Sequence, residues 1–258
     1  MMKLRQAIRN QWLWAAAALI YPLLCLPLAM LAIYALNHAG LGAELTGFSL
    51  HRLHVLLDDG PMRHAVLNLM LIAYAGGGAA TWLGTLAGMA MHRRKPKPMQ
   101  SLAAGTAARP KILLGVSLLL VLQALNFTLG LYSLLIAHIA FSAGFTALAV
   151  GTRLADMDGR IFDAARDLGA APGQALRLVI LPLLMPGIAA GALMVLTLTL
   201  NAFVFAFLTA GIGASTLPLQ IHAMINVAAT PEVNAVSTLL MLLTLSMIAL
   251  ASRFAPKK

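Results

Sequence analysis

The chain has 258 residues, of which 60% are hydrophobic and only 10% are charged. A soluble domain of this size needs more polar surface than such a composition supplies, so the chain belongs in a lipid bilayer. The 18 Lys and Arg residues exceed the 8 Asp and Glu residues, which could suggest a nucleic-acid-binding protein. These basic residues gather beside apolar stretches, where they orient a membrane protein, and we therefore predict no nucleic-acid partner.

Apolar stretches long enough to cross a bilayer predict an all-α, polytopic protein with about six transmembrane helices in one domain, residues 1–258. The expected spans are approximately 12–36, 62–91, 98–127, 129–150, 179–210 and 234–252. The first stretch is longer than the apolar core of a secretory signal, which is about 7–15 residues, so we interpret it as an uncleaved span.

The basic residues predict the topology. One cluster lies between the second and third spans, and a second group follows the fourth span; the members are His92, Arg93, Arg94, Lys95, Lys97, Arg153, Arg160, Arg166 and Arg177. Basic loops stay on the cytoplasmic side, so both termini are expected in the cytoplasm.

Small residues recur at helical spacing. Gly84 and Gly88, and likewise Gly187 and Gly191, are four residues apart, which allows helices to approach closely. The run of three glycines at 76–78 fits either a flexible gate or the same tight packing between helices.

The segment 155–180, between the fourth and fifth spans, is polar and patterned as two short helices. Gly169 can end the first helix in a left-handed cap, and Pro172 suits the first turn of the next. The spacing predicts one apolar stripe along the segment. Its members are Ala164, Leu168, Ala171, Ala175 and Leu178.

This segment resembles the EAA signature of bacterial ABC importer permeases. The matching residues are Asp163, Ala164, Ala165, Gly169, Val179, Leu181 and Pro182, with the spacing of the signature. The resemblance implies a cytoplasmic coupling helix that docks onto a dimer of ATP-hydrolysing subunits. The residues expected at this contact are Asp163, Ala164, Ala165, Asp167, Leu168, Gly169 and Ala170. The departure is Asp163, which stands where the signature usually has glutamate and keeps the charge on a shorter side chain.

Further stretches are similar to the spermidine/putrescine branch of these permeases over about residues 46–253. They are Thr46 to Phe48, Ala137 to Phe141, Arg153 with Leu154, and Thr230 to Ala235. The resemblance implies the second permease of a pair in the bacterial inner membrane. Its expected partners are the ATPase dimer, a homologous or identical second permease and a periplasmic solute-binding protein, with alternating access as the mechanism.

The expected cargo departs from the polyamine members of that branch. Where they carry an aspartate pair in the fifth span and an aspartate after a proline in the third, this chain has Asn201-Ala202 and Lys111, with Arg109 nearby. Cations inside a membrane need a pathway or a partner. We therefore expect Arg109, Lys111 and Asn201 to line a pathway for an anionic or zwitterionic solute such as 2-aminoethylphosphonate.

The alternative cargo is a polyamine. The alternative interpretation of Arg109 and Lys111 is that the third span starts at Pro110 and leaves both cations at the cytoplasmic headgroups. Asn201 could equally serve as a hydrogen-bonding group between helices.

Other classes of protein fit less well. The chain has no G-x-x-x-x-G-K-[ST] loop, so ATP and Mg²⁺ are expected on a separate ATPase subunit, and this subunit is expected to be non-catalytic and to bind no cofactor or metal. A secondary transporter or channel would need carboxylates inside the apolar runs, where this chain has none. The lone His138 of the fourth span is interpreted as a hydrogen-bonded packing residue.

Overall fold

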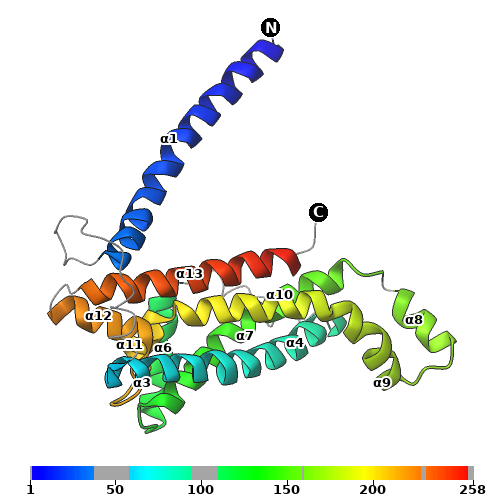
Figure 1. Cartoon of the computed structure of the whole chain (residues 1–258). Helices are drawn as coiled ribbons and strands as arrows, with labels where there is room; N and C mark the ends of the chain where they lie inside the picture. The colour runs from blue at the N-terminus through cyan, green and yellow to red at the C-terminus, as the bar shows by residue number, and fades with distance from the viewer. Residues whose placement is uncertain (1, 38–57, 95–109, 159, 228–230, 255–258) are drawn as a thin grey trace. The chain divides into compact units, whose positions relative to one another are not determined.

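The computed structural model describes residues 2–37, 58–94, 110–158, 160–227 and 231–254, and the regular elements in this part are helices. Contacts group the chain into two units. The first comprises Met1–Asp59 with Ala223–Met241, and the second comprises Gly60–His222 with Leu242–Lys258. The elements are shown in Figure 1.

Five helical stretches of the described residues are long and apolar enough to cross a membrane. They lie in α1 (Met2–Leu36), in the run of α3 (Gly60–Leu71), η1 (Ile72–Gly76) and α4 (Gly77–Arg94), in α7 (Leu131–Ala155), in the run of α9 (Pro172–Ala175), η2 (Leu176–Ile180) and α10 (Leu181–Leu200), and in α13 (Pro231–Phe254). The prediction of a helical, polytopic membrane protein is therefore confirmed, with five such helices rather than about six.

The third predicted span, 98–127, is represented by the shorter helix α6 (Lys111–Ala124), because residues 98–109 lie outside the described part. The helix ends where Asn126 adopts a left-handed conformation with φ 52°. The Phe127 N–H then donates to the Leu122 carbonyl at 2.9 Å, which closes the helix end. The described helix has 14 residues and starts directly after Pro110, as in the shorter alternative.

The fifth predicted span, 179–210, is wrong as one continuous helix. Helix α10 ends at Leu200, Asn201 has φ −110° and ψ 23°, and a separate helix α11 (Phe203–Thr209) follows. The Asn201 side chain donates to the Thr197 carbonyl at 3.1 Å, which satisfies a carbonyl at the end of α10. The short helix α12 (Leu217–Val227) was not anticipated in the segment expected outside the membrane.

The first unit joins the end of α1 to α13. The Thr238 hydroxyl donates to the Leu31 carbonyl at 3.4 Å, and Ala35 and Val236 are buried. The middle of α1 is different, because Leu19, Tyr21 and Leu23 are each at least two-thirds exposed, as suits a helix that meets lipid.

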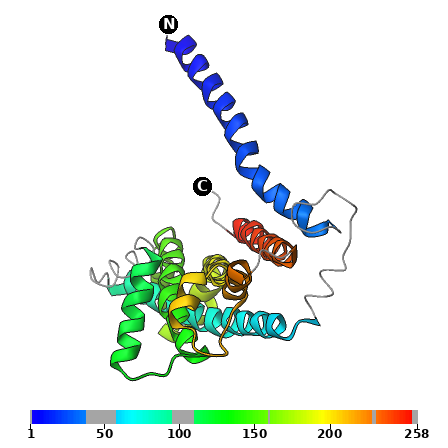
Figure 2. The same cartoon turned by 90° about the vertical axis from the view of Figure 1, so that its left-hand side faces the viewer.

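The second unit is organised around α7, against which both α4 and α10 pack. The turned view in Figure 2 also shows the short helix α11 (gold) beside the green helices, in agreement with its contacts to α6 and α7. The arrangement makes α7 the most enclosed of the membrane helices, with buried residues along most of its length.

Glycines set these close approaches. A Cβ atom on Gly84 would lie 2.5 Å from the Ala143 carbonyl oxygen, and one on Gly191 would lie 3.0 Å from Cγ2 of Thr146. Gly88 and Gly187 show the same crowding against α7. The predicted packing role of the two glycine pairs is therefore confirmed. The triple glycine differs, because a Cβ on Gly78 would meet nothing within 4 Å.

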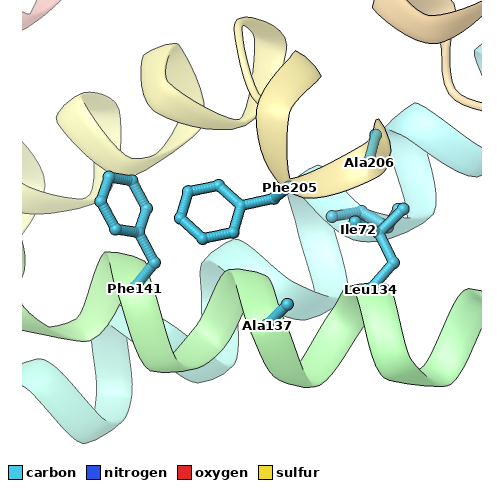
Figure 3. Packing of buried hydrophobic residues seen from close by; sticks show 6 residues of the cluster. All are labelled: Ile72, Leu134, Ala137, Phe141, Phe205 and Ala206. Atoms are coloured by element: carbon cyan, nitrogen blue, oxygen red, sulfur yellow. The ribbon is translucent and has the colours of Figure 1, made fainter. Parts of the chain in front are cut away.

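An apolar cluster fills the space where η1, α7 and α11 meet (Figure 3). Its members are Ile72, Leu134, Ala137, Phe141, Phe205 and Ala206. The Phe141 and Phe205 rings lie 4.6 Å apart between centroids, within the usual range of favourable aromatic pairs. This cluster holds α11 against α7 after the chain leaves α10.

We expect Gly84→Ala to destabilise the protein by about 1–3 kcal/mol, because the added methyl overlaps the α7 backbone. The matched control is Gly78→Ala, which adds the same methyl where space is open. The midpoint of thermal unfolding in detergent should fall for the first variant and not for the second. Equal midpoints for the two variants would contradict the glycine-dependent approach of α4 to α7.

Candidate functional site

The segment 155–180 forms a small projection that connects α7 to α10 (Figure 1). Its first helix is α8 (Arg160–Asp167). The Asp158 carboxylate accepts a hydrogen bond from the Arg160 N–H at 3.0 Å, which is the role of an N-cap side chain. Two short helices occur there, as the sequence predicts.

The end of α8 is a Schellman motif centred on Gly169, whose φ is 86°. The Gly169 N–H donates to the Arg166 carbonyl at 2.9 Å, and the Ala170 N–H donates to the Ala165 carbonyl at 3.1 Å. Because a side chain is strained in this conformation, glycine suits the position. The predicted left-handed cap is confirmed.

The chain then enters the second helix at Pro172. The Gln174 side-chain oxygen accepts a hydrogen bond from the Ala171 N–H at 3.1 Å, and this bond fixes the helix start. The sequence interpretation did not assign a capping role to Asp158 or Gln174. Both roles could have been inferred from position, because Asp158 lies two residues before Arg160 and Gln174 lies three residues after Ala171.

The outer surface of α8 is exposed and carries both charged and apolar side chains. Asp163, Ala164, Arg166 and Asp167 are exposed, and Leu168 is 88% exposed at the helix end. None of these charged residues forms an ion pair with another described residue. Leu168 therefore presents an apolar side chain beside charged ones on the outside of the projection.

The predicted single apolar stripe is wrong. Ala175 is fully buried, whereas Leu168 and Leu178 are 88% and 71% exposed. The reversal of the chain at Gly169 separates the two helices, so the i, i+4, i+7 spacing does not continue from one to the next. Within the segment, Ala165 and Ala175 face inward and Leu168 faces outward.

The base of the projection is anchored in a second apolar cluster. Val150 and Leu154 of α7 pack there against Ile180 and Leu184, with Met89 of α4 beside them. Arg153 also reaches across, donating from Nε to the Leu183 carbonyl at 3.4 Å. Because of these contacts, a movement of the projection would move the adjoining ends of both α7 and α10.

A π-helical turn, η2, precedes Pro182. Proline lacks an N–H and its ring crowds the carbonyl four residues earlier, so regular α-helical bonding cannot continue through this position. The wider turn accommodates the proline without ending the helix, and π-turns of this kind often occur at functional positions.

The structure does not bring the expected pathway residues together. Lys111 is exposed in the first turn of α6, Asn201 is exposed at the break after α10, and Arg109 lies outside the described residues. Asn201 acts on its own helix through the Thr197 carbonyl. No group of three or more His, Cys, Asp or Glu side chains among the described residues could hold a metal ion.

A groove of about 400 Å³ runs between α4 and α10 within the second unit, and it contains neither Lys111 nor Asn201. Tyr74 and Trp82, which are 72% and 65% exposed, flank it, and Gly77, Gly78 and Thr81 leave the space between them. Sequence reasoning singled out the glycines but not these aromatic residues.

His138 is fully buried and hydrogen-bonded, as the sequence interpretation held. Its Nε2 lies 2.6 Å from the Thr199 hydroxyl of α10 and 3.1 Å from the Ser142 hydroxyl of α7. No sequence pattern indicated that Thr199, 61 residues away, is the partner.

Comparisons with known proteins agree with this architecture. Residues 80–258, which are more than half of the chain, match the family of binding-protein-dependent transport system inner membrane components. The spermidine/putrescine transport system permease PotC of Escherichia coli is 34% identical over 232 residues, covering 89% of this chain and 88% of the relative. PotC of Haemophilus influenzae is 30% identical, covering 95% of each chain, and the putrescine permease PotI of Escherichia coli is 32% identical, covering 91% and 87%.

Solved structures share the fold. A bacterial ABC transporter that imports the polysaccharide alginate superposes with a TM-score of 0.70 at 14% identity, covering 98% of this chain and 100% of the other. The inward-facing MetNI methionine ABC transporter gives a TM-score of 0.64 at 19% identity, covering 80% and 97%. The chain belongs to the family of binding-protein-dependent transport system inner membrane components, the non-catalytic, multi-pass membrane subunits of ABC importers.

Proposed function

We propose that this chain is the second membrane-spanning subunit of an ABC importer for polyamines, and that the projection at 155–180 docks onto the ATPase dimer. Both termini lie in the cytoplasm, and a binding protein delivers the solute at the periplasmic side. A homologous permease forms the membrane-spanning pair with this chain. ATP and Mg²⁺ bind to the ATPase, and alternating access moves the solute inward.

The observation that carries the docking proposal is the combination of a rigid cap with an exposed surface. The Schellman bonds and the buried Ala165 fix the shape of α8, while Leu168 and the charges of Asp163 and Asp167 point away from the protein. A preorganised contact loses little conformational entropy on binding. The proposed contact comprises Asp163, Ala164, Asp167, Leu168, Gly169 and Ala170, with the buried Ala165 supporting it from the inner side of α8.

Relatives support a polyamine as the cargo. Three permeases named for spermidine or putrescine transport are 30–34% identical to this chain over most of their lengths. A polyamine carries several ammonium groups, which interact favourably with aromatic faces. The exposed rings of Tyr74 and Trp82 beside the groove offer such faces.

An anionic cargo receives less support. It was inferred from Arg109 and Lys111, but Lys111 is exposed in the first turn of α6, from which a long side chain can reach the headgroups. The Asn201 amide donates within α10. 2-Aminoethylphosphonate remains the second candidate, because neither residue is the aspartate found in polyamine permeases.

Leu168→Asp is expected to release the ATPase subunit from the membrane complex, because it places a charge in an apolar contact. Truncation of an anchor residue typically costs 2 kcal/mol or more, so we expect ATPase retention to fall by about 30-fold. The measurement is the amount of ATPase that co-purifies with tagged permease. Ile212→Asp changes another highly exposed apolar residue, which lies outside the projection, and serves as the control. Full retention by the Leu168 variant would refute the proposed contact.

Uptake of labelled putrescine, spermidine and 2-aminoethylphosphonate tests the cargo. Cells should hold the neighbouring transporter subunits constant and differ only in the presence of this chain. We expect chain-dependent uptake of putrescine or spermidine, because the relatives share most of the chain. Chain-dependent uptake of the phosphonate alone would reverse the assignment and restore the anionic cargo.

A further inference from the structure

A hydrogen bond joins His138 of α7 to Thr199 of α10. The Thr199 hydroxyl donates its single proton to the Val195 carbonyl at 2.8 Å, as threonines in helices commonly do. The same hydroxyl oxygen lies 2.6 Å from the imidazole Nε2 of His138, so a hydrogen bond joins the two helices here. Both side chains are at most 1% exposed.

The imidazole has few other partners. Its Nδ1 atom is buried and has no hydrogen-bond partner in the described part of the chain. Among the described residues, the other hydrogen-bond partner of Nε2 is the Ser142 hydroxyl, which lies on the same helix. Thr199 is thus the residue that connects the ring to another helix, and water cannot readily replace it within the membrane.

The position of this bond along the helices is distinctive. Helices α7 and α10 are the two that leave the projection, and Arg153 joins them near its base through the Leu183 carbonyl. Thr199 is the last residue but one of α10, immediately before the break at Asn201. The bond therefore joins α7 and α10 at the end far from the projection.

The next contact beyond the break involves α11. Phe141, one turn after His138 on α7, packs against Phe205 of α11 with the ring centroids 4.6 Å apart (Figure 3). If α10 separated from α7 at Thr199, a displacement of the projection would be absorbed at the break. With the bond intact, the same displacement reaches the cluster that holds α11.

We propose that His138 and Thr199 act as positioning residues that fasten α7 to α10, so that both helices move as one body when ATP closes the ATPase dimer. The proposal rests on the proposed docking of the projection. The bond does not contact the solute. It determines how much of the movement at the cytoplasmic side is transmitted to the outer end of the bundle.

The decisive variant is Thr199→Val, which replaces the hydroxyl by a methyl of similar size. Thr197→Val is the matched control, since the Thr197 hydroxyl donates to the Leu193 carbonyl of its own helix at 2.9 Å. Thr199→Ser keeps the hydroxyl and should restore the behaviour of the unmodified chain. The full transporter is reconstituted in proteoliposomes, and ATP hydrolysis and putrescine uptake are measured together.

Thr199→Val is expected to consume at least about fivefold more ATP per putrescine transported, the lower end of typical coupling between sites. A purely structural role would lower hydrolysis and uptake in proportion to the amount of assembled complex, with an unchanged ratio. An unchanged ratio in Thr199→Val, or an equal change in Thr197→Val, would overturn the proposal.

A second readout does not require the correct cargo. Nitroxides are attached at Ile136→Cys on α7 and Met194→Cys on α10, after Cys25→Ser removes the native thiol. Dipolar broadening should stay the same with and without trapped ATP in the parent and in Thr197→Val, and should change in Thr199→Val. No change in Thr199→Val would refute the fastening. If the parent fails to take up putrescine, the cargo assignment fails, and these spectra alone decide the role of Thr199.

Discussion

The close approach of α4 and α10 to α7 is the contact on which the rest of the described bundle depends. A bilayer supplies little hydrophobic force between helices, so their association relies on van der Waals packing at short distance. Thr146 illustrates the consequence, because Gly84 of α4 and Gly191 of α10 both lie against it. A helix held on two faces in this way is a firm support for the projection that follows Ala155 and for α11 near its other end.

Several features were predictable from the sequence because short-range chemistry determines them. Gly169 and Pro172 fixed the boundaries of the two short helices, and the i, i+4 spacing of Gly84 with Gly88 indicated a packed helix face. Apolar length located four of the spans to within a few residues. In each case the information lies in a short stretch of consecutive residues and not in a distant part of the chain.

Features were missed where a local break overrides a continuous apolar pattern, or where the partner is distant in the sequence. The hydrophobicity of 179–210 is continuous, but the Asn201 amide bonds to Thr197 and the helix ends there. Leu168 is exposed and Ala175 is buried because the chain reverses direction between them. The predicted stripe assumed one continuous helical periodicity across this reversal. The pairing of His138 with Thr199 needs the packed structure, since 61 residues separate them.

The Schellman end of α8 also bears on how such transporters diversify. Its shape is maintained by main-chain hydrogen bonds and by a single glycine, rather than by the side chains that point outward. Substitutions at Ala164, Arg166 or Leu168 can therefore alter the chemistry of the projection while its backbone is retained. Given the proposed docking of this projection, a duplicated permease could change its preference for one ATPase over another through a few such replacements, without passing through a misfolded intermediate.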